Sequence, residues 1–155
     1  MKFYFHFSYL PQDHERVFPV ALWMHTNSYG EIRQANAAVK AMIGLVEKFG
    51  IEEEIIESQR EKLKDNPGSE RVSKMVSMCL RHNIPIVNIV HVLDQLGDLY
   101  VTDTIFAVKK FLSEHVEDGA EVLGAVCENE ECGSERIVFA GGCSVCQDCG
   151  SSACN

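Results

Sequence analysis

Residues 127–154 read CENEECGSERIVFAGGCSVCQDCGSSAC, and this stretch contains six of the chain's seven cysteines. Cys127 and Cys132 form a C-x4-C, and Cys143 and Cys146 form a C-x2-C ten residues further on. This spacing is close to that of a zinc ribbon, in which four thiolates surround one Zn2+. Glycines after the first pair and before the second suit the tight turns that such ligands need. The spacing therefore predicts zinc bound by Cys127, Cys132, Cys143 and Cys146.

The overlapping cysteine motifs leave a second set of ligands open. Cys146-x2-Cys149 is also a C-x2-C, so Cys149 could replace Cys143, which would leave Cys143 and Cys154 without metal. We favour Cys149 and Cys154 as the free pair, because only small residues, 150–153, separate them near the chain end. Such a pair closes a disulfide with little strain, and thiol–disulfide exchange requires accessible thiolates. This terminal C-x4-C is the predicted redox pair.

The residues before the cysteines predict an α+β body. Residues 3–9 alternate between apolar and polar as a strand does, and a second apolar run over 17–24 predicts the other strand of a hairpin. Pro19 restricts that strand to an edge or bulged position. A capping box, Ser28-x-x-Glu31, then starts the first of four or five predicted helices, which is expected to end at Gly50. The predicted helices cover residues 31–48, 51–64, 70–82, 85–96 and 103–116.

We expect three parts along the chain: an α+β body over 1–117, a linker over 118–126 and a cysteine-rich zinc ribbon with a terminal redox pair over 127–155. Small residues in 118–126 predict a hinge, which a mobile redox tail would need. Cys79 lies outside this region, on the apolar face of the 70–82 helix, and is predicted to be a core residue.

Composition and charge restrict the class of protein. The net charge is -9, and the cysteine-rich region is acidic, which argues against binding to nucleic acid. The chain starts without an apolar signal segment, and no apolar run reaches the roughly 20 residues that span a bilayer. We therefore expect a cytoplasmic protein without membrane contact, in which clustered cysteines indicate metal or redox chemistry more than structural disulfides.

The tail, GCSVCQDCGSSAC over residues 142–154, resembles the C-terminal cysteine-rich region (zinc-ribbon, TSCPD-like) of adenosylcobalamin-dependent class II ribonucleotide reductases. That region reads G-C-x2-C-x2-C-G-x-S-x-C. The stretch from Val72 to Leu96, with an Arg-His-Asn-Ile-Pro turn between two apolar helices, is similar to the segment that precedes it there. The resemblance covers residues 70–155, and more loosely 17–155.

The resemblance implies a role in deoxyribonucleotide synthesis. In the family, a terminal C-x4-C swings in to reduce the active-site disulfide formed in each turnover, and this role falls to Cys149 and Cys154. The chain departs from the family because it lacks the catalytic barrel, and Cys79 is its single cysteine outside the tail. The C-x4-C at 127–132 also exceeds the usual C-x2-C.

We therefore expect a separate C-terminal subunit of a split enzyme, not catalytic by itself. Its partners would be the catalytic reductase chain, which would hold the adenosylcobalamin, and a reductant of the thioredoxin or glutaredoxin type. The alternative, from a different class, is a zinc-ribbon adaptor that binds another protein without redox chemistry.

Overall fold

The computed structural model describes residues 3–10, 18–26, 32–65, 68–96 and 104–152. Two strands, β1 (Phe3–Leu10) and β2 (Phe18–Thr26), precede the helices α1 (Ile32–Lys48), α2 (Glu53–Leu63), α3 (Gly68–Arg81), α4 (Ile86–Asp94) and α5 (Thr104–Ser113). Two short strands follow, β3 (Ile137–Ala140) and β4 (Cys143–Cys146). The described residues confirm the mixed α and β composition, with five helices and the N-terminal hairpin. The predicted capping box lies outside the described residues.

The N-terminal hairpin is antiparallel and bulged where the sequence predicts. Ser8 pairs with Ala21 and Tyr9 pairs with Pro19, so Val20 has no partner in the register. Proline donates no backbone hydrogen bond, and a bulge beside it accommodates the missing donor. The hairpin packs on α3. There, the Ser77 hydroxyl accepts a hydrogen bond from the backbone N–H of Leu22 (3.1 Å).

Four helices, α1, α3, α4 and α5, form the hydrophobic core beneath the hairpin. Backbone motifs end two of them. Gly50 has φ 74, and the N–H of Ile51 bonds to the carbonyl of Val46, which closes α1 with a Schellman turn. Asn83, with φ 58, takes the same role after α3. It places Pro85 at the start of α4, where a missing N–H does no harm.

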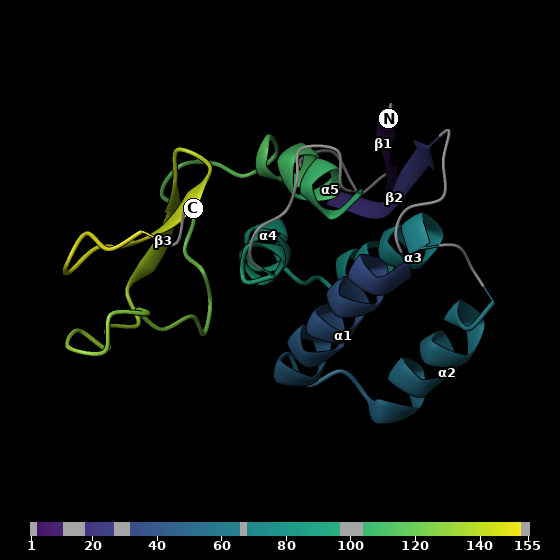
Figure 1. Cartoon of the computed structure of the whole chain (residues 1–155), viewed down its shortest axis with the longest axis horizontal. Coiled ribbons are helices and arrows are strands. Elements are labelled where there is room, and N and C mark those ends of the chain that lie inside the picture. The colour runs from purple at the N-terminus through teal and green to yellow at the C-terminus, as the bar shows by residue number, and fades with distance from the viewer. Residues whose placement is uncertain (1–2, 11–17, 27–31, 66–67, 97–103, 153–155) are drawn as a thin grey trace.

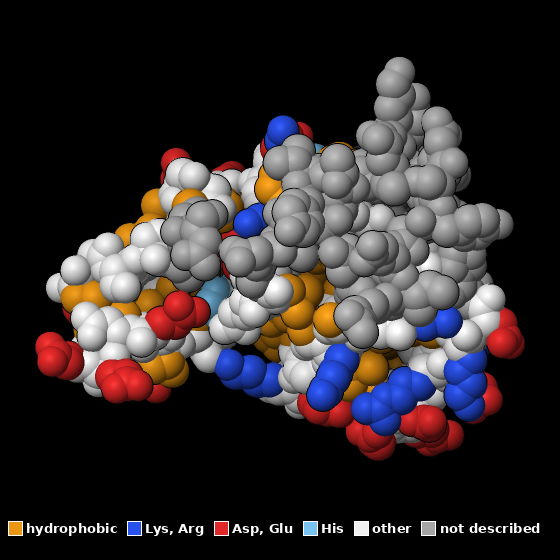
Figure 2. All heavy atoms as spheres, viewed as in Figure 1, with side chains coloured by type: hydrophobic (Ala, Val, Ile, Leu, Met, Phe, Trp, Pro, Cys, Tyr) orange, Lys and Arg blue, Asp and Glu red, His pale blue; other side chains and the backbone are white. Residues whose placement is uncertain are grey.

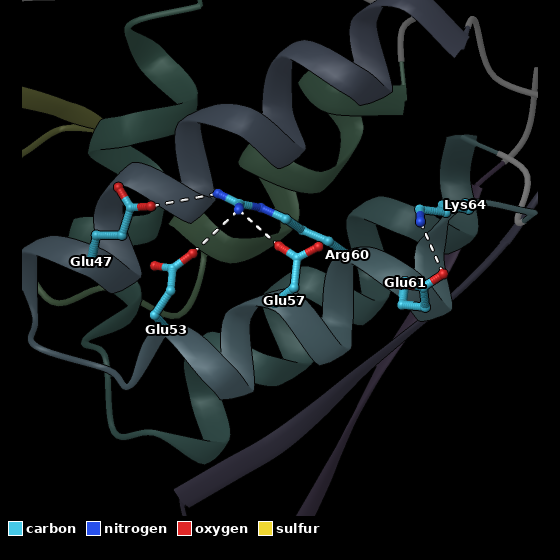
Figure 3. A network of polar contacts seen from close by, with 6 residues as sticks. All are labelled: Glu47, Glu53, Glu57, Arg60, Glu61 and Lys64. Carbon is cyan, nitrogen blue, oxygen red and sulfur yellow. Dashed lines mark hydrogen bonds and ion pairs between the residues drawn. The ribbon is translucent and has the colours of Figure 1, made fainter.

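The second helix lies on the outside of this core. Its buried side chains are Ile56 and Leu63. Arg60 forms ion pairs with Glu53 and Glu57 on its own helix and reaches Glu47 of α1 at 3.6 Å (Figure 3). These pairs are exposed, so they guide the placement of α2 more than they stabilise it.

The C-terminal module, which we define as residues 118–152, lies to one side of the helices (Figure 1). Its strands β3 and β4 pack on each other and make no comparably broad contact with any described helix. The last helix, α5, leads directly into the module, and α4 is the helix drawn nearest to it (Figure 1). The apolar core nevertheless continues into the module, since Cys127, Ile137, Phe139 and Cys146 belong to the same buried cluster as the helices.

Candidate metal centre

A small antiparallel sheet supports the cysteines. β3 and β4 pair with Ile137 opposite Cys146 and Ala140 opposite Cys143. Gly141 and Gly142 connect them with φ values of 58 and 90, a conformation that matches a type I′ turn and favours glycine at both positions. The chain before the first cysteine also pairs with β3, because the N–H of Val122 bonds to the carbonyl of Ile137 (2.9 Å).

The first pair of cysteines is brought together by a compact turn centred on Asn129. The Asn129 carbonyl accepts hydrogen bonds from the N–H groups of Cys132 (2.9 Å) and Gly133 (3.2 Å), and its side-chain oxygen accepts one from Glu131. The N–H of Cys127 bonds to Ser134 beyond the turn (2.8 Å). The four-residue spacer therefore folds back on itself, and Cys132 returns to Cys127.

The second pair of cysteines is Cys146 and Cys149. Cys146 is the last residue of β4, and a tight turn follows in which the N–H of Gly150 bonds to the Cys146 carbonyl (2.9 Å). Arg136 holds this turn from the neighbouring strand. Its guanidinium donates to Asp148 (2.6 Å) and to the Gln147 side chain (3.1 Å).

These two turns bring four thiols into one cluster. The sulfur atoms of Cys127, Cys132, Cys146 and Cys149 all lie within 4.8 Å of one another. The Cys127–Cys149 pair is 3.5 Å apart and the Cys132–Cys146 pair 3.8 Å. Ligands at the usual Zn–S distance in a tetrahedron lie roughly 3.8 Å apart. The cluster thus has dimensions that could hold one metal ion, and all four cysteines are free thiols.

The surroundings of the cluster shift the pKa values of Cys146 and Cys127 in opposite directions. The backbone N–H groups of Cys149 and Asp148 lower the pKa of the Cys146 thiol to about 6, against the opposing effect of burial. At Cys127 the backbone N–H of Asn129 lowers the pKa, but burial and the neighbouring thiols outweigh it and raise the value to about 12. Several negative sulfurs at such short range repel one another, and a bound cation relieves that repulsion.

Cys143 was predicted to be a metal ligand, but it is not part of the cluster, where Cys149 takes its place. The reason is the phase of β4: side chains alternate along a strand, so Cys143 and Cys146 lie on opposite faces. Ser144 and Cys146 are buried on one face, whereas Cys143 and Val145 are half-buried on the other. Cys143-x2-Cys146 is therefore an extended strand instead of a metal-binding turn. Cys143 is also not a free thiol, because it is disulfide-bonded.

Of the expected redox pair, the structure describes Cys149 alone. Cys149 is exposed as a residue, yet its sulfur belongs to the four-thiol cluster. Cys154 lies outside the described residues. Of the cysteines before the module, Cys79 is fully buried in α3, which agrees with its predicted place in the core, and burial raises the pKa of its thiol to about 12.

Segment 118–126, expected to be a linker, contacts both the sheet and the helices. Val122 and Ala125 are buried. On the helical side, the Asn88 side chain donates to the Leu123 carbonyl (2.8 Å), and the Lys48 ammonium donates to the Gly124 carbonyl. The segment thus forms an edge of the module, and its predicted hinge motion stays a prediction.

Sequence reasoning missed the helical residues at this junction. Asn88 is 2% exposed and stands within an otherwise apolar run, Ile86 to Val90. A polar residue on a buried helical face was the available signal, because buried amides normally have a partner. His91, one turn further along α4, places its Nδ1 3.0 Å from the Ser144 hydroxyl of β4. Nothing in the sequence indicated that contact.

Comparison of the chain with protein-family models, with curated proteins and with solved structures found no match. Among the described helices, none is long and apolar enough to cross a membrane.

Proposed function

We propose that this chain is an accessory subunit of a ribonucleotide reductase, which passes reducing equivalents to the active-site disulfide of a separate catalytic chain. The observation that supports this most is the division of the module's cysteines into two chemical groups. Four are free thiols in one cluster, whereas Cys143 is disulfide-bonded on the opposite face of β4. A set of thiols that can bind a metal ion and a separate disulfide that can be exchanged are the two parts that such a subunit needs.

The metal we propose is zinc. A donor set of four thiolates without imidazole or carboxylate is typical of structural Zn2+ sites. The spacing between the sulfurs fits such an ion, and the cluster belongs to a segment with few buried apolar residues of its own. When bound, zinc would hold the two cysteine turns together and would take no part in electron transfer. Cys127, Cys132, Cys146 and Cys149 would hold it.

The redox step requires one dithiol in this chain. One of its thiolates attacks a sulfur of the target disulfide, which forms a mixed disulfide and releases one thiolate of the target. The second thiol then attacks the mixed disulfide, so the target leaves as a dithiol and this chain becomes a disulfide. Two electrons and two protons pass in total. A dithiol protein of the thioredoxin or glutaredoxin class then reduces this chain by the same two steps.

The form of the module suits exchange between partners. It projects from the helical body (Figure 1), and a polar contact between His91 of α4 and Ser144 of β4 joins the two. Acidic side chains, drawn in red, gather at its outer end (Figure 2). A charged surface favours rapid encounter with an oppositely charged partner.

Reconstitution with the catalytic chain tests the proposal. With a thioredoxin-type reductant, we expect the wild-type subunit to support many turnovers and Cys143→Ser to limit the enzyme to about one. A small dithiol that reaches the catalytic chain directly should restore turnover in that variant. Cys79→Ala, which removes a cysteine outside the module, is the matched control. Multiple turnovers with Cys143→Ser and the protein reductant would contradict the shuttle role.

The second candidate is a metal-stabilised adaptor without redox chemistry. Leu123 and Val126 are 47% and 54% exposed, and Glu121 and Glu128 lie beside them in the sequence. An apolar pair with acidic neighbours suits a protein surface that is apolar with a basic rim. Thiol titration of the reduced, metal-loaded chain separates the two functions. About two fast-reacting thiols favour the shuttle, and none favours the adaptor.

A further inference from the structure

The four cluster thiols differ in their access to solvent. Cys149 is exposed and Cys132 is half-buried, whereas Cys127 and Cys146 are only 8% and 2% exposed. A cysteine reacts with a dissolved oxidant when the oxidant can reach it, so oxidation is selective for the accessible position. Cys149 is therefore the cysteine at which an oxidant meets the cluster first.

The cluster sulfurs also lie close together in pairs that span the two turns. The sulfur of Cys127 is 3.5 Å from that of Cys149, and the sulfur of Cys132 is 3.8 Å from that of Cys146. The S–S bond of a disulfide is about 2.05 Å long, so each pair needs an approach of roughly 1.5–1.8 Å, which rotation of the two side chains can supply. Each pair joins a thiol of the first cysteine turn to a thiol of the second.

We propose that the four-thiol cluster is also a site of oxidative modification, at which a hydroperoxide joins Cys127 to Cys149 and so displaces the metal ion. Cys132 and Cys146 form the second disulfide. This property goes beyond the proposed subunit function and does not depend on it. Only the displacement of the ion depends on the zinc proposed above.

Two steps form the first disulfide. The Cys149 sulfur attacks one oxygen of hydrogen peroxide, so an S–O bond forms, the O–O bond breaks, hydroxide leaves and Cys149 becomes a sulfenic acid. The Cys127 sulfur then attacks the Cys149 sulfur, so the S–S bond forms, the S–O bond breaks and a second hydroxide leaves. With the two thiol protons counted, two thiols and one peroxide give one disulfide and two waters. A second peroxide oxidises the other pair in the same way.

Loss of the metal ion follows from the same chemistry. Zinc is bound by thiolates, and a disulfide sulfur no longer carries that charge. The first disulfide therefore removes two of the four ligands. Because each disulfide connects the same two turns that the metal ion would hold, we expect the oxidised module to keep its fold without metal. Chelation of the reduced chain leaves the turns unconnected.

Peroxide treatment of the full, zinc-loaded chain, followed by disulfide mapping, tests the proposal. We expect Cys127 to be linked to Cys149 before Cys132 is linked to Cys146, with one zinc ion released per chain to a chromogenic chelator. A link within one turn, such as Cys127 to Cys132, or disulfides that form while zinc is retained would overturn the proposal. Cleavage after glutamate and before aspartate places the four cluster cysteines in separate peptides, 122–128, 132–135, 136–147 and 148–155.

Variants test the order of the two steps. Cys149→Ser should slow the first oxidation several-fold, because the remaining cluster thiols are less exposed. Cys132→Ser should keep the Cys127–Cys149 link and lose the second one. Each variant lacks one zinc ligand, so both are mapped in excess zinc. Cys79→Ala, which removes a buried thiol outside the cluster, should match the wild-type chain in both links and rate. Equal oxidation rates for Cys149→Ser and wild type would contradict the order.

Hydrogen exchange tests whether the disulfides replace the metal ion. The backbone N–H groups of Cys127 and Cys146, which bond to Ser134 and Ser151, should stay protected in the oxidised, metal-free chain and exchange rapidly in the reduced, metal-free chain. Rapid exchange in both forms would overturn this part of the proposal. None of these measurements uses the catalytic chain. If the links form but the subunit does not support the reductase, the modification stands and the proposed function fails. If they do not form, the subunit function remains open.

Discussion

The helical body and the C-terminal module are ordered by different forces. In the body, large apolar side chains such as Met42, Ile89 and Leu112 are fully buried. In the module, buried apolar side chains are few, and Phe139 is the largest of them. Four thiols are gathered there in one cluster. The comparison teaches that a short segment with few buried apolar side chains can gather its thiols in one place, where a metal ion could add to its stability.

The largest effect that separates the two regions is expected from metal removal. A strong chelator should unfold the module, because structural Zn2+ in small domains contributes about 10–16 kcal/mol of apparent binding free energy. The backbone N–H groups of Cys127 and Cys146 should lose their protection from hydrogen exchange. The helical circular dichroism of the body should stay within a few per cent of its starting value, because α1, α3, α4 and α5 bury their own apolar faces.

Loss of the helical signal on chelation would show that the two regions fold as one unit. Cys146→Ser without chelator should reproduce the effect on the module, and Cys79→Ala should not.

A cavity in the body should destabilise the body and leave metal binding by the module unchanged. Ile89 is fully buried in α4, so Ile89→Ala should lower the free energy of unfolding of the body by about 2–5 kcal/mol. Chemical denaturation followed by circular dichroism measures this change. Metal content should remain at the wild-type value, because the cluster thiols come from the module alone. Lys40→Ala, an exposed substitution on α1, should change stability by less than about 0.5 kcal/mol.

The junction between the regions should respond to Asn88→Ala. This change removes the hydrogen bond from the Asn88 side chain to the Leu123 carbonyl, which is worth about 1 kcal/mol. Hydrogen exchange in residues 121–126 should become faster, and exchange within β3 and β4 should remain near wild type. Lys40→Ala, an exposed substitution on α1, is the control. Equal exchange rates in both variants would mean that Asn88 does not fasten the segment.

The smallest effect concerns pH. Burial raises the pKa of the Cys79 thiol to about 12, so the folded chain keeps this proton between pH 9 and 12 while the unfolded chain, with its ordinary thiol pKa near 9, loses it. The stability linked to Cys79 is complete below pH 9 and declines above it, by at most about 1.4 kcal/mol per pH unit. Denaturation of wild type and Cys79→Ala at pH 8 and pH 10 measures the difference, and identical pH slopes would exclude the effect.

Local patterns in the sequence were sufficient for most of the body. The alternation in residues 3–9 predicted β1, and Pro19 predicted the irregularity of β2. The helical period and the breakers at Gly50 and Pro85 predicted the helices to within a few residues. These features depend on neighbours along the chain, which the sequence contains directly.

The cysteine spacing by itself determined that a four-thiol cluster would form in the tail, and it named two possible quartets. Only the tertiary structure decided between them. Once β3 pairs with β4, with Ile137 opposite Cys146, the alternation of the strand directs Cys143 to the other face and leaves Cys149 to complete the cluster. The junction at Asn88 was decided in the same way, because its partner carbonyl is 35 residues distant in the chain. Spacing specifies which groups can meet, whereas strand register and packing specify which of them do.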